Sequence, residues 1–405
     1  MAKVAIMGYG TVGSGLIELI DANREKQKND IEITSILVKD INENKESAHV
    51  DILTEDVEKF FSADSDIIVE LIGGLSPAYD YVKRALKLKK HVVTANKDLI
   101  ATYGKELFKI ANENNVSLKF EAAVGGGIPI IKPILETLCG NEINSIKAIL
   151  NGTTNFILTK MSKEKISYNE ALKEAQDLGF AEANPESDVM GYDAARKLAI
   201  LSTLAFHKRV DWEKINIEGI SKIDEDDIKY ANKYGCKIKL IAEAFKESNG
   251  IYATVKPIMI DNNNLLANID NEVNIVVLNG DEIGELSFIG KGAGKLPTGS
   301  AVYGDICDII NNRHVLVKSF NKEEAEINYY SNNTCNCILR IKTLDKEETI
   351  EQCRKSFNNM KVLDKNISDE VNIFIECTSE AYIQILIDKL AKEEYYISSK
   401  KLIFA

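Results

Sequence analysis

The sequence predicts an α/β protein, and three observations support this class. A buried strand opens the chain and leads through a glycine-rich turn into an apolar helix. Strand and helix patterns then alternate to about residue 135, and beyond residue 333 their order is strand, helix, strand, strand, helix, strand. We therefore expect an N-terminal Rossmann-type parallel sheet, a central α+β domain and a C-terminal ferredoxin-like domain.

The amino-acid composition limits the kinds of partner and the cellular location that the protein can have. The 405 residues carry 50 basic and 62 acidic side chains, a net charge of −12, which argues against nucleic acid or an anionic membrane as the main partner. The chain has no apolar run of about 18 residues, so we expect neither a membrane span nor a signal peptide. The seven cysteines are scattered and odd in number, which favours a reduced, cytoplasmic protein.

The first motif follows the strand Lys3–Met7. Glycines there allow a tight turn and close backbone approach, and the next helix points its N-terminus at a pyrophosphate. A tight turn without a ligand is the alternative. The predicted cofactor contacts are Gly8, Gly10, Thr11, Val12 and Gly13.

The next strands lead to further cofactor contacts. Ile31–Val38 ends at Lys39 and Asp40, where an acid favours NAD and a base accepts the NADP phosphate, so the preference between NADP and NAD stays open. Two later strands end in polar or glycine loops, which the rule for parallel sheets places beside the nicotinamide. These loops contribute Gly73, Gly74, Thr94 and Lys97, although Lys97 on its own can be a surface lysine.

Two glycine turns border the central part of the chain. Val124–Pro129 exposes backbone oxygens that can bind a cation or substrate, or it serves as a hinge. Lys291–Val302 precedes a helix, and its Gly292 and Gly294 can place amides against cofactor or substrate. We expect a dinucleotide-binding domain over residues 1–135, to which 291–318 returns, and a substrate and dimerisation domain over 136–290.

The stretch Glu182–Lys197 is the strongest candidate for chemistry. It begins as a loop and becomes a helix at Asp193, which places Asp193 and Lys197 one turn apart on the same face. We expect four acids to converge on Lys197: Glu182, Glu186, Asp188 and Asp193. The alternative is an ordinary surface ion pair.

The C-terminal part begins after a polar linker, Asn321–Asn333. Residues 334–405 then show the ferredoxin-like order of elements. This domain is expected either to bind an amino acid as a regulator or to serve only for dimerisation.

In this order, the motifs resemble those of homoserine dehydrogenases over nearly the whole chain. The Glu182–Lys197 block is the most specific, and the others are Gly8–Gly13, Thr94–Lys97, Glu121–Pro129, Asn151–Asn155 and Lys291–Val302. Residues 334–405 resemble the ACT domain that many members carry. The resemblance implies reversible NAD(P)-dependent interconversion of L-homoserine and L-aspartate 4-semialdehyde, in threonine and methionine biosynthesis, by a cytoplasmic homodimer or homotetramer.

The resemblance also assigns roles to residues. Lys197 corresponds to the acid/base, Lys97 shares in proton transfer, and Asp193 is the partner of Lys197. Glu182, Asp188, Asp193, Lys97 and Thr153 correspond to substrate contacts. Backbone oxygens of Glu121, Val124, Gly126 and Ile128 correspond to a site for Na⁺ or K⁺, and the ACT-like domain to a site for an amino-acid effector.

The chain departs from the family pattern at two places. Asn184 stands before Pro185 where the family has Asp, and the loop Thr343–Glu348 lacks the usual glycine. Two other functions compete with the resemblance: another amino-acid dehydrogenase of similar architecture, and a non-catalytic NAD(P)-binding sensor. The presence of Lys97, Lys197 and Glu182 speaks against the sensor.

Overall fold

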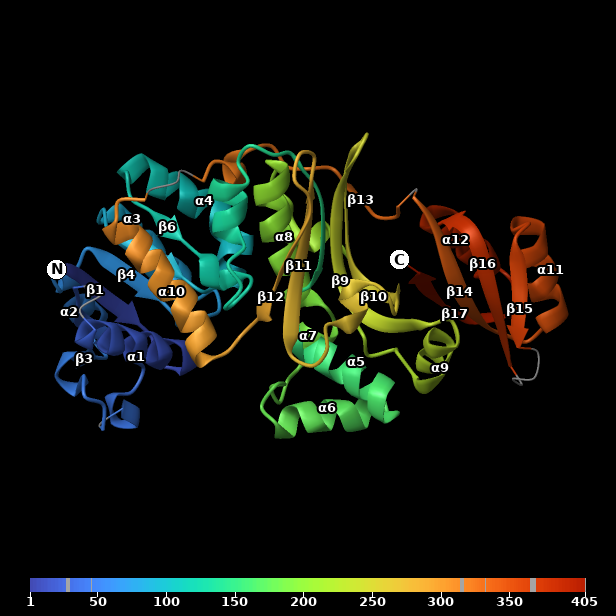
Figure 1. The fold of residues 1–405 in the computed structure, drawn as a ribbon, viewed down its shortest axis with the longest axis horizontal. Coiled ribbons are helices and arrows are strands. Elements are labelled where there is room, and N and C mark those ends of the chain that lie inside the picture. The colour runs from blue at the N-terminus through green and yellow to red at the C-terminus, as the bar shows by residue number, and fades with distance from the viewer. Residues whose placement is uncertain (27–29, 45, 314–316, 332, 365–368, 405) are drawn as a thin grey trace.

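The computed structural model describes residues 1–26, 30–44, 46–313, 317–331, 333–364 and 369–404. The molecule is elongated, with the N-terminal domain at one end, the central domain in the middle and the C-terminal domain at the other end (Figure 1). This arrangement agrees with the predicted α/β class and its three parts.

The N-terminal domain is built on a six-stranded parallel sheet in the order β3-β2-β1-β4-β5-β6. This is the doubly wound order, in which connections reverse direction between β1 and β4 and leave a crevice at the carboxyl ends of the strands. The strands are β1 (Ala2–Met7), β2 (Ile31–Leu37), β3 (Leu53–Thr54), β4 (Ile67–Glu70), β5 (His91–Thr94) and β6 (Leu118–Lys119).

Helices cover both faces of this sheet, because successive side chains of a strand point to opposite sides. Val4 and Ile6 of β1 pack toward α1 (Thr11–Glu25), whereas Ala5 and Met7 belong to the core on the other face. That second core includes α2 (Val57–Ser62), α3 (Ala78–Lys87) and α4 (Lys97–Asn114).

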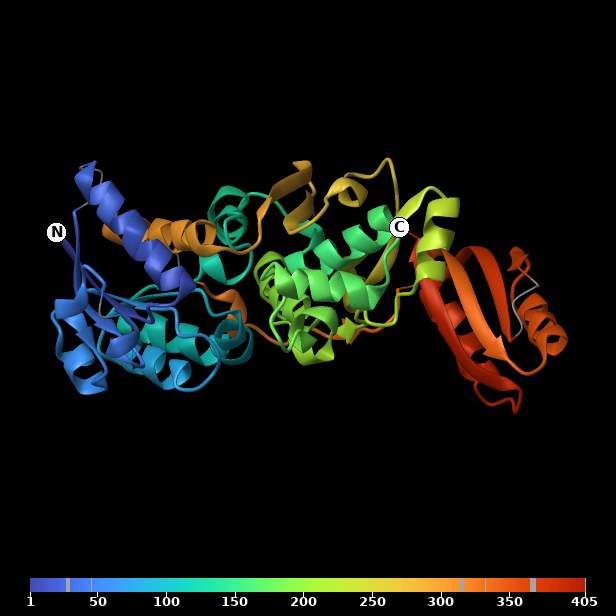
Figure 2. The ribbon, with the colours of Figure 1, turned by 90° about the horizontal axis from the view of Figure 1, so that it is seen from below.

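A late helix returns to the N-terminal domain. Helix α10 (Lys295–Ile310) lies beside α1 in both views (Figures 1 and 2). At their crossing, a Cβ on Gly15 would lie 2.5 Å from the Lys295 carbonyl oxygen, so only glycine permits this approach. After α10, Phe320 stacks on Phe108 of α4 with ring centroids 4.8 Å apart.

The central domain contains an antiparallel sheet in the order β12-β11-β7-β9-β10. Its strands are β7 (Ile143–Ile149), β9 (Cys236–Glu247), β10 (Gly250–Asp261), β11 (Val273–Gly280) and β12 (Gly284–Lys291). Its helices are α5 (Gly152–Glu164), α6 (Tyr168–Asp177), α7 (Glu186–Val189), α8 (Tyr192–Phe206) and α9 (Glu225–Lys233). Helix α8 is buried along most of its length and lies between this sheet and α4.

The C-terminal domain has the strand order β17-β14-β16-β15, all antiparallel, with two helices. This is the ferredoxin-like topology that the order of patterns predicts. Its elements are β14 (Thr334–Thr343), α11 (Lys346–Ser356), β15 (Met360–Asp364), β16 (Glu370–Ser379), α12 (Glu380–Leu390) and β17 (Tyr396–Phe404).

The structure adds features that the sequence patterns do not predict. The sequence does not predict strand β9, because charged residues and helix formers interrupt its alternation of apolar positions. Strand β13 (Ile327–Asn328) lies in the segment expected to be a plain linker and pairs with β10. Strand β17 also pairs with β10, Ile258 with Ile403 and Met259 with Phe404, so the central and C-terminal sheets are continuous.

Candidate active site

The turn after β1 has the geometry of a dinucleotide-binding loop. Gly8 has φ +102°, and a Cβ on Gly13 would lie 2.2 Å from the Gly8 carbonyl oxygen, so both glycines are needed for the turn itself. Gly10 is exposed, and a Cβ there would meet nothing within 4 Å. Thr11 and Val12 follow in the first turn of α1, where backbone amides lack intrahelical partners and can face a phosphate.

The end of β2 presents Lys39 rather than Asp40. The Lys39 side chain is exposed, whereas the Asp40 carboxylate accepts hydrogen bonds from the Asn42 backbone amide at 2.7 Å and its side-chain amide at 2.8 Å. The acid is thus engaged in its own turn, and the base is open to solvent.

The loops after β4 and β5 are tied together at the carboxyl edge of the sheet. Gly73 and Gly74 have φ values of +77° and +68°. The Asn96 side chain donates to the Gly74 carbonyl at 2.6 Å, and the Thr94 hydroxyl accepts from the Asn96 amide at 3.0 Å. Asn96 also caps α4, so the predicted residue Lys97 is the first residue of that helix.

Lys97 and Lys197 meet at one buried carboxylate. Lys97 Nζ lies 3.2 Å from Asp193 Oδ1, and Lys197 Nζ lies 2.8 Å from Asp193 Oδ2. Lys197 also donates to the Leu150 carbonyl at 2.9 Å, and its side chain is only 12% exposed. Helix α8 therefore brings Lys197 to the end of β5, beside the loops expected to hold the nicotinamide.

Lys97, Asp193 and Lys197 form a triad, and its charges shift the pKa values of Asp193 and Lys97. Burial raises the pKa of Asp193, but the Lys197 and Lys97 ammonium groups outweigh burial and hold that pKa well below its usual range. Burial lowers the pKa of Lys97, but Asp193 and then Asp98 outweigh it, so the pKa of Lys97 is raised. In this geometry the two carboxylates outweigh both burial and the nearby Arg196 guanidinium, so Lys97 is an ammonium at neutral pH.

Asn151 joins the triad to Asp188. Its side-chain amide donates to Asp188 Oδ1 at 2.7 Å and to Asp193 Oδ2 at 2.9 Å. Its oxygen accepts from the Thr154 amide at 2.8 Å, which caps α5. Burial raises the pKa of Asp188, as does the charge of Asp193. The hydroxyl of the predicted residue Thr153 lies close enough to Asp188 to lower its pKa, and it donates to the Phe180 carbonyl at 2.6 Å.

Of the four acids expected around Lys197, Asp193 pairs with it and Asp188 is joined to the same group through Asn151. Glu182 and Glu186 are exposed and form no ion pair with Lys197 among the described residues, so their convergence on Lys197 stays a prediction. Phe180 packs on Phe156, with ring centroids 4.9 Å apart, and after the buried Ala181 the loop is exposed over residues 182–184.

The predicted cation loop packs on the second glycine turn. The Gly127 amide donates to the Lys291 carbonyl at 3.0 Å, and a Cβ on Gly126 would lie 2.3 Å from the Gly292 carbonyl oxygen. Gly294 has φ +124° and precedes α10. Glu121, Val124, Gly126 and Ile128 all belong to this loop or the turn before it. The Glu121 carboxylate accepts from the amides of residues 130–132 at 2.6–2.8 Å, and burial raises its pKa.

The sequence does not predict the roles of two polar residues of the site. Asn151 was identified only within a motif, and its role as a bridge depends on tertiary contacts. Glu70 is fully buried and bonded to the Thr94 hydroxyl at 2.6 Å. The sequence offers one indication of this buried role, because Glu70 is the single charged residue within the apolar run Ile67–Ile72.

The fold and the site define an oxidoreductase that binds a nicotinamide dinucleotide at a doubly wound sheet and carries paired lysines beside it. Residues 8–121 match the model of the NAD-binding domain of homoserine dehydrogenase, and residues 129–307 match the homoserine dehydrogenase model. The chain belongs to the homoserine dehydrogenase family and is an NAD(P)-dependent oxidoreductase.

Individual relatives agree with this assignment. The homoserine dehydrogenase of Bacillus subtilis (strain 168) is 44% identical over 316 residues, 76% of this chain and 73% of that protein. The crystal structure of a homoserine dehydrogenase from Thiobacillus denitrificans has a TM-score of 0.89 at 33% identity and covers 100% of this chain and 98% of its own. The structure of a hyperthermophilic archaeal homoserine dehydrogenase in complex with NADPH has a TM-score of 0.65 at 29% identity. The match covers 78% of this chain and 99% of the archaeal one.

Proposed function

We propose that the triad Lys97, Asp193 and Lys197 carries the proton in the interconversion of L-homoserine and L-aspartate 4-semialdehyde. The nicotinamide cofactor supplies or accepts the hydride. In reduction, a lysine ammonium donates a proton to the aldehyde oxygen, and in oxidation the neutral lysine removes the hydroxyl proton. The observation that carries this proposal is the single buried carboxylate between two ammonium groups at the end of β5.

The two lysines differ in their environments. Lys197 is the more buried and already donates to Asp193 and the Leu150 carbonyl, which fixes its position. Lys97 is 29% exposed and contacts the other oxygen of Asp193. We propose Lys197 as the acid/base and Lys97 as a second ammonium that shares the proton transfer.

Substrate recognition is proposed for the loop before α8 and the start of α5. Asp188 and Asp193 are held side by side through Asn151, and Thr153 lies against Asp188, so these groups can accept hydrogen bonds from the substrate. The exposed Glu182 carboxylate can pair with the substrate ammonium, a charge-assisted contact that selects amino acids over plain alcohols.

The cofactor is proposed to lie across the turn Gly8–Gly13 with its nicotinamide at Gly73, Gly74 and Thr94. The open Gly10 gives backbone access to the pyrophosphate. The exposed Lys39 and the engaged Asp40 favour NADP over NAD, because an ammonium can pair with the 2′-phosphate. The archaeal relative was solved with NADPH.

A monovalent cation, Na⁺ or K⁺, is proposed to bind backbone oxygens of Glu121, Val124, Gly126 and Ile128. The loop offers backbone oxygens, the ligand type that such a cation prefers, and its tight path requires glycine, because a Cβ on Gly125 would lie 2.5 Å from the Ile128 carbonyl oxygen. Its contact with Gly292 would connect the cation to the turn that begins α10.

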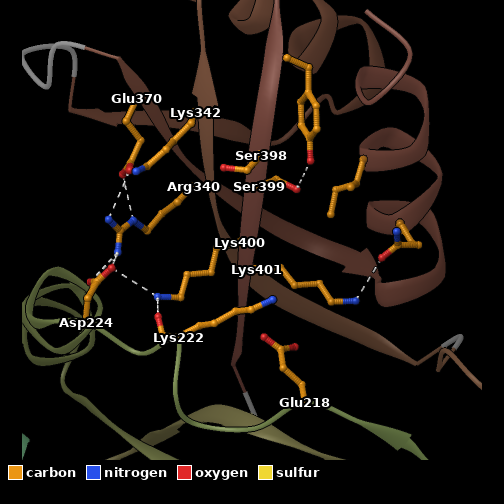
Figure 3. Close-up of a pocket in the computed structure, with 13 residues that line it drawn as sticks. Glu218, Lys222, Asp224, Arg340, Lys342, Glu370, Ser398, Ser399, Lys400 and Lys401 are labelled. Carbon is orange, nitrogen blue, oxygen red and sulfur yellow. Dashed lines mark hydrogen bonds and ion pairs between the residues drawn. The ribbon is translucent and has the colours of Figure 1, made fainter. Parts of the chain in front are cut away.

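An amino-acid effector is proposed at the ACT-like domain, in a cavity of about 690 Å³ between this domain and the segment before α9. Figure 3 shows Glu218 and Lys222 on one side of the cavity and Ser398 and Lys400 on the other. A carboxylate and ammonium groups together match both ends of a zwitterion. The loop that lacks the usual glycine is closed by its own contacts, with the Thr343 and Thr349 hydroxyls 2.8 Å apart.

We propose that the protein acts in the cytoplasm as a homodimer or homotetramer. None of the described helices has the length and apolar character that crossing a bilayer requires. The cysteines of the chain are free thiols, as expected in a reducing compartment. The central sheet ends at the edge strand β12, which offers backbone groups for pairing with a second copy.

The proposal is tested by assaying purified protein with L-homoserine and each of NAD⁺ and NADP⁺. We expect turnover, with Lys197→Ala lowering kcat by at least about 100-fold, as for the loss of a general acid/base. Added KCl, NaCl and threonine test the cation and effector proposals in the same assay. Cofactor binding without turnover on any amino alcohol would contradict the proposal and support the sensor.

A further inference from the structure

Glu70 ends β4 as a carboxylate with no exposed surface. One oxygen accepts from the Ile72 amide at 2.9 Å and the Gly73 amide at 3.0 Å, and the other accepts from the Thr94 hydroxyl at 2.6 Å. Because both oxygens act as acceptors, the contacts fit the ionised form of the side chain.

This negative charge is not matched by a nearby cation. Among the residues that the structure describes, no lysine, arginine or histidine forms an ion pair with Glu70. Amide and hydroxyl dipoles alone stabilise the carboxylate, so its field extends into the surrounding crevice. A buried charge is screened less than an exposed one.

The position of Glu70 relates this field to the cofactor. Its hydrogen bonds join the loop after β4 to the loop after β5, and Asn96 closes the same connection through the Gly74 carbonyl. In a doubly wound sheet these two loops flank the crevice in which the nicotinamide lies. Glu70 is therefore below the floor of the proposed nicotinamide pocket.

We propose that Glu70 is a positioning residue whose buried charge favours the oxidised cofactor over the reduced one. The nicotinamide ring carries a positive charge in the oxidised form and none after it accepts a hydride. An anion beneath the ring attracts only the charged form, which shifts the balance of the two affinities toward the oxidised cofactor. This inference rests on the position proposed above for the nicotinamide.

The test compares Glu70→Gln with the wild type by titrating both forms of the preferred cofactor. The glutamine oxygen can keep both amide contacts, and its amide can donate to the Thr94 hydroxyl, so the change removes mainly the charge. We expect the ratio of the Kd for oxidised to reduced cofactor to rise about fivefold or more. Fluorescence of the reduced cofactor, with the oxidised form as competitor, measures both constants.

Thr94→Val is the matched control, because it removes the hydroxyl contact and keeps the charge. This variant is expected to weaken the binding of both cofactor forms alike. The ratio of the Kd for oxidised to reduced cofactor should therefore stay within about twofold of the wild type. The inference would be overturned if the ratio of the two Kd values did not change in Glu70→Gln. It would also be overturned if Thr94→Val raised this ratio as much as Glu70→Gln does.

Ile72→Lys keeps the test decisive if Glu70→Gln folds poorly. This side chain is 39% exposed, so it can carry an ammonium on the same loop without altering the contacts of Glu70. We expect the ratio to rise in the same direction as with Glu70→Gln. An unchanged ratio would show that charge at this loop does not reach the ring. Failure of the wild type to bind either form would instead contradict the proposed function.

Discussion

At the residue scale, the site depends on how three charged groups share one buried position. Asp193 places one oxygen against each lysine, and Asn151 fixes the carboxylate from a third direction. The raised pKa of Lys97 makes it a proton donor at neutral pH, which suits reduction of the aldehyde. Oxidation of the alcohol needs the neutral amine and is therefore favoured at higher pH.

Asp193→Asn is expected to move the pH profile of homoserine oxidation to lower pH. Without the carboxylate, burial and the Arg196 guanidinium lower the pKa of Lys97, and a base with a lower pKa loses its proton at lower pH. The rise of kcat/KM should shift down by about one unit or more, while kcat itself falls. Initial rates between about pH 6 and about pH 10 measure the shift.

Asp98→Asn is the control for this prediction. Asp98 also raises the pKa of Lys97, but less than Asp193 does, and its carboxylate pairs with Arg196 at 3.2 Å. A smaller shift in the same direction is expected. An unchanged profile in Asp193→Asn would show that Lys97 does not share in the proton transfer.

At the element scale, the glycines of the first turn divide into two kinds. Gly8 and Gly13 make the turn possible, because side chains there would collide with backbone of the protein itself. Gly10 faces open space, so its lack of a side chain matters only when something binds there. The sequence motif treats these glycines alike, and the contacts distinguish them.

Gly10→Ala and Gly13→Ala separate folding from cofactor binding. For Gly10→Ala we expect a stability within about 0.5 kcal/mol of the wild type and a cofactor Kd raised about tenfold or more. For Gly13→Ala we expect a loss of stability of about 1–3 kcal/mol in addition to weak binding. Thermal unfolding and cofactor titration give both quantities. Wild-type affinity in Gly10→Ala would contradict the proposed position of the pyrophosphate.

At the scale of the whole molecule, buried charges join the C-terminal domain to the central one. Arg340 of β14 pairs with Asp227 of α9 at 2.6 Å and with Glu370 of β16 at 2.9 Å. On the other side of β17, Lys256 of β10 contacts the buried Glu380 of α12. Together with the β10–β17 pairing, these contacts make the two domains one continuous unit.

Arg340→Met is expected to destabilise the protein by about 3 kcal/mol, because it leaves the buried Glu370 carboxylate without its partner and leaves the buried Asp227 with Lys400 alone. Urea unfolding, followed by intrinsic fluorescence, measures the loss. Arg354→Met on the exposed side of α11 is the matched control and should stay within about 0.5 kcal/mol of the wild type. Equal stability of both variants would show that the pairs of Arg340 contribute nothing net.

The sequence alone determined the three-part α/β architecture, the family motifs and the pairing of Asp193 with Lys197, because these follow from short-range spacing and periodicity. Tertiary structure decided which of the surrounding acids reach Lys197, that Lys97 shares its carboxylate, and that Asn151 and Glu70 fix the site. It also decided that β17 continues the central sheet. Such contacts join residues that are far apart in the chain, and local sequence patterns do not predict which distant residues come together in the folded protein.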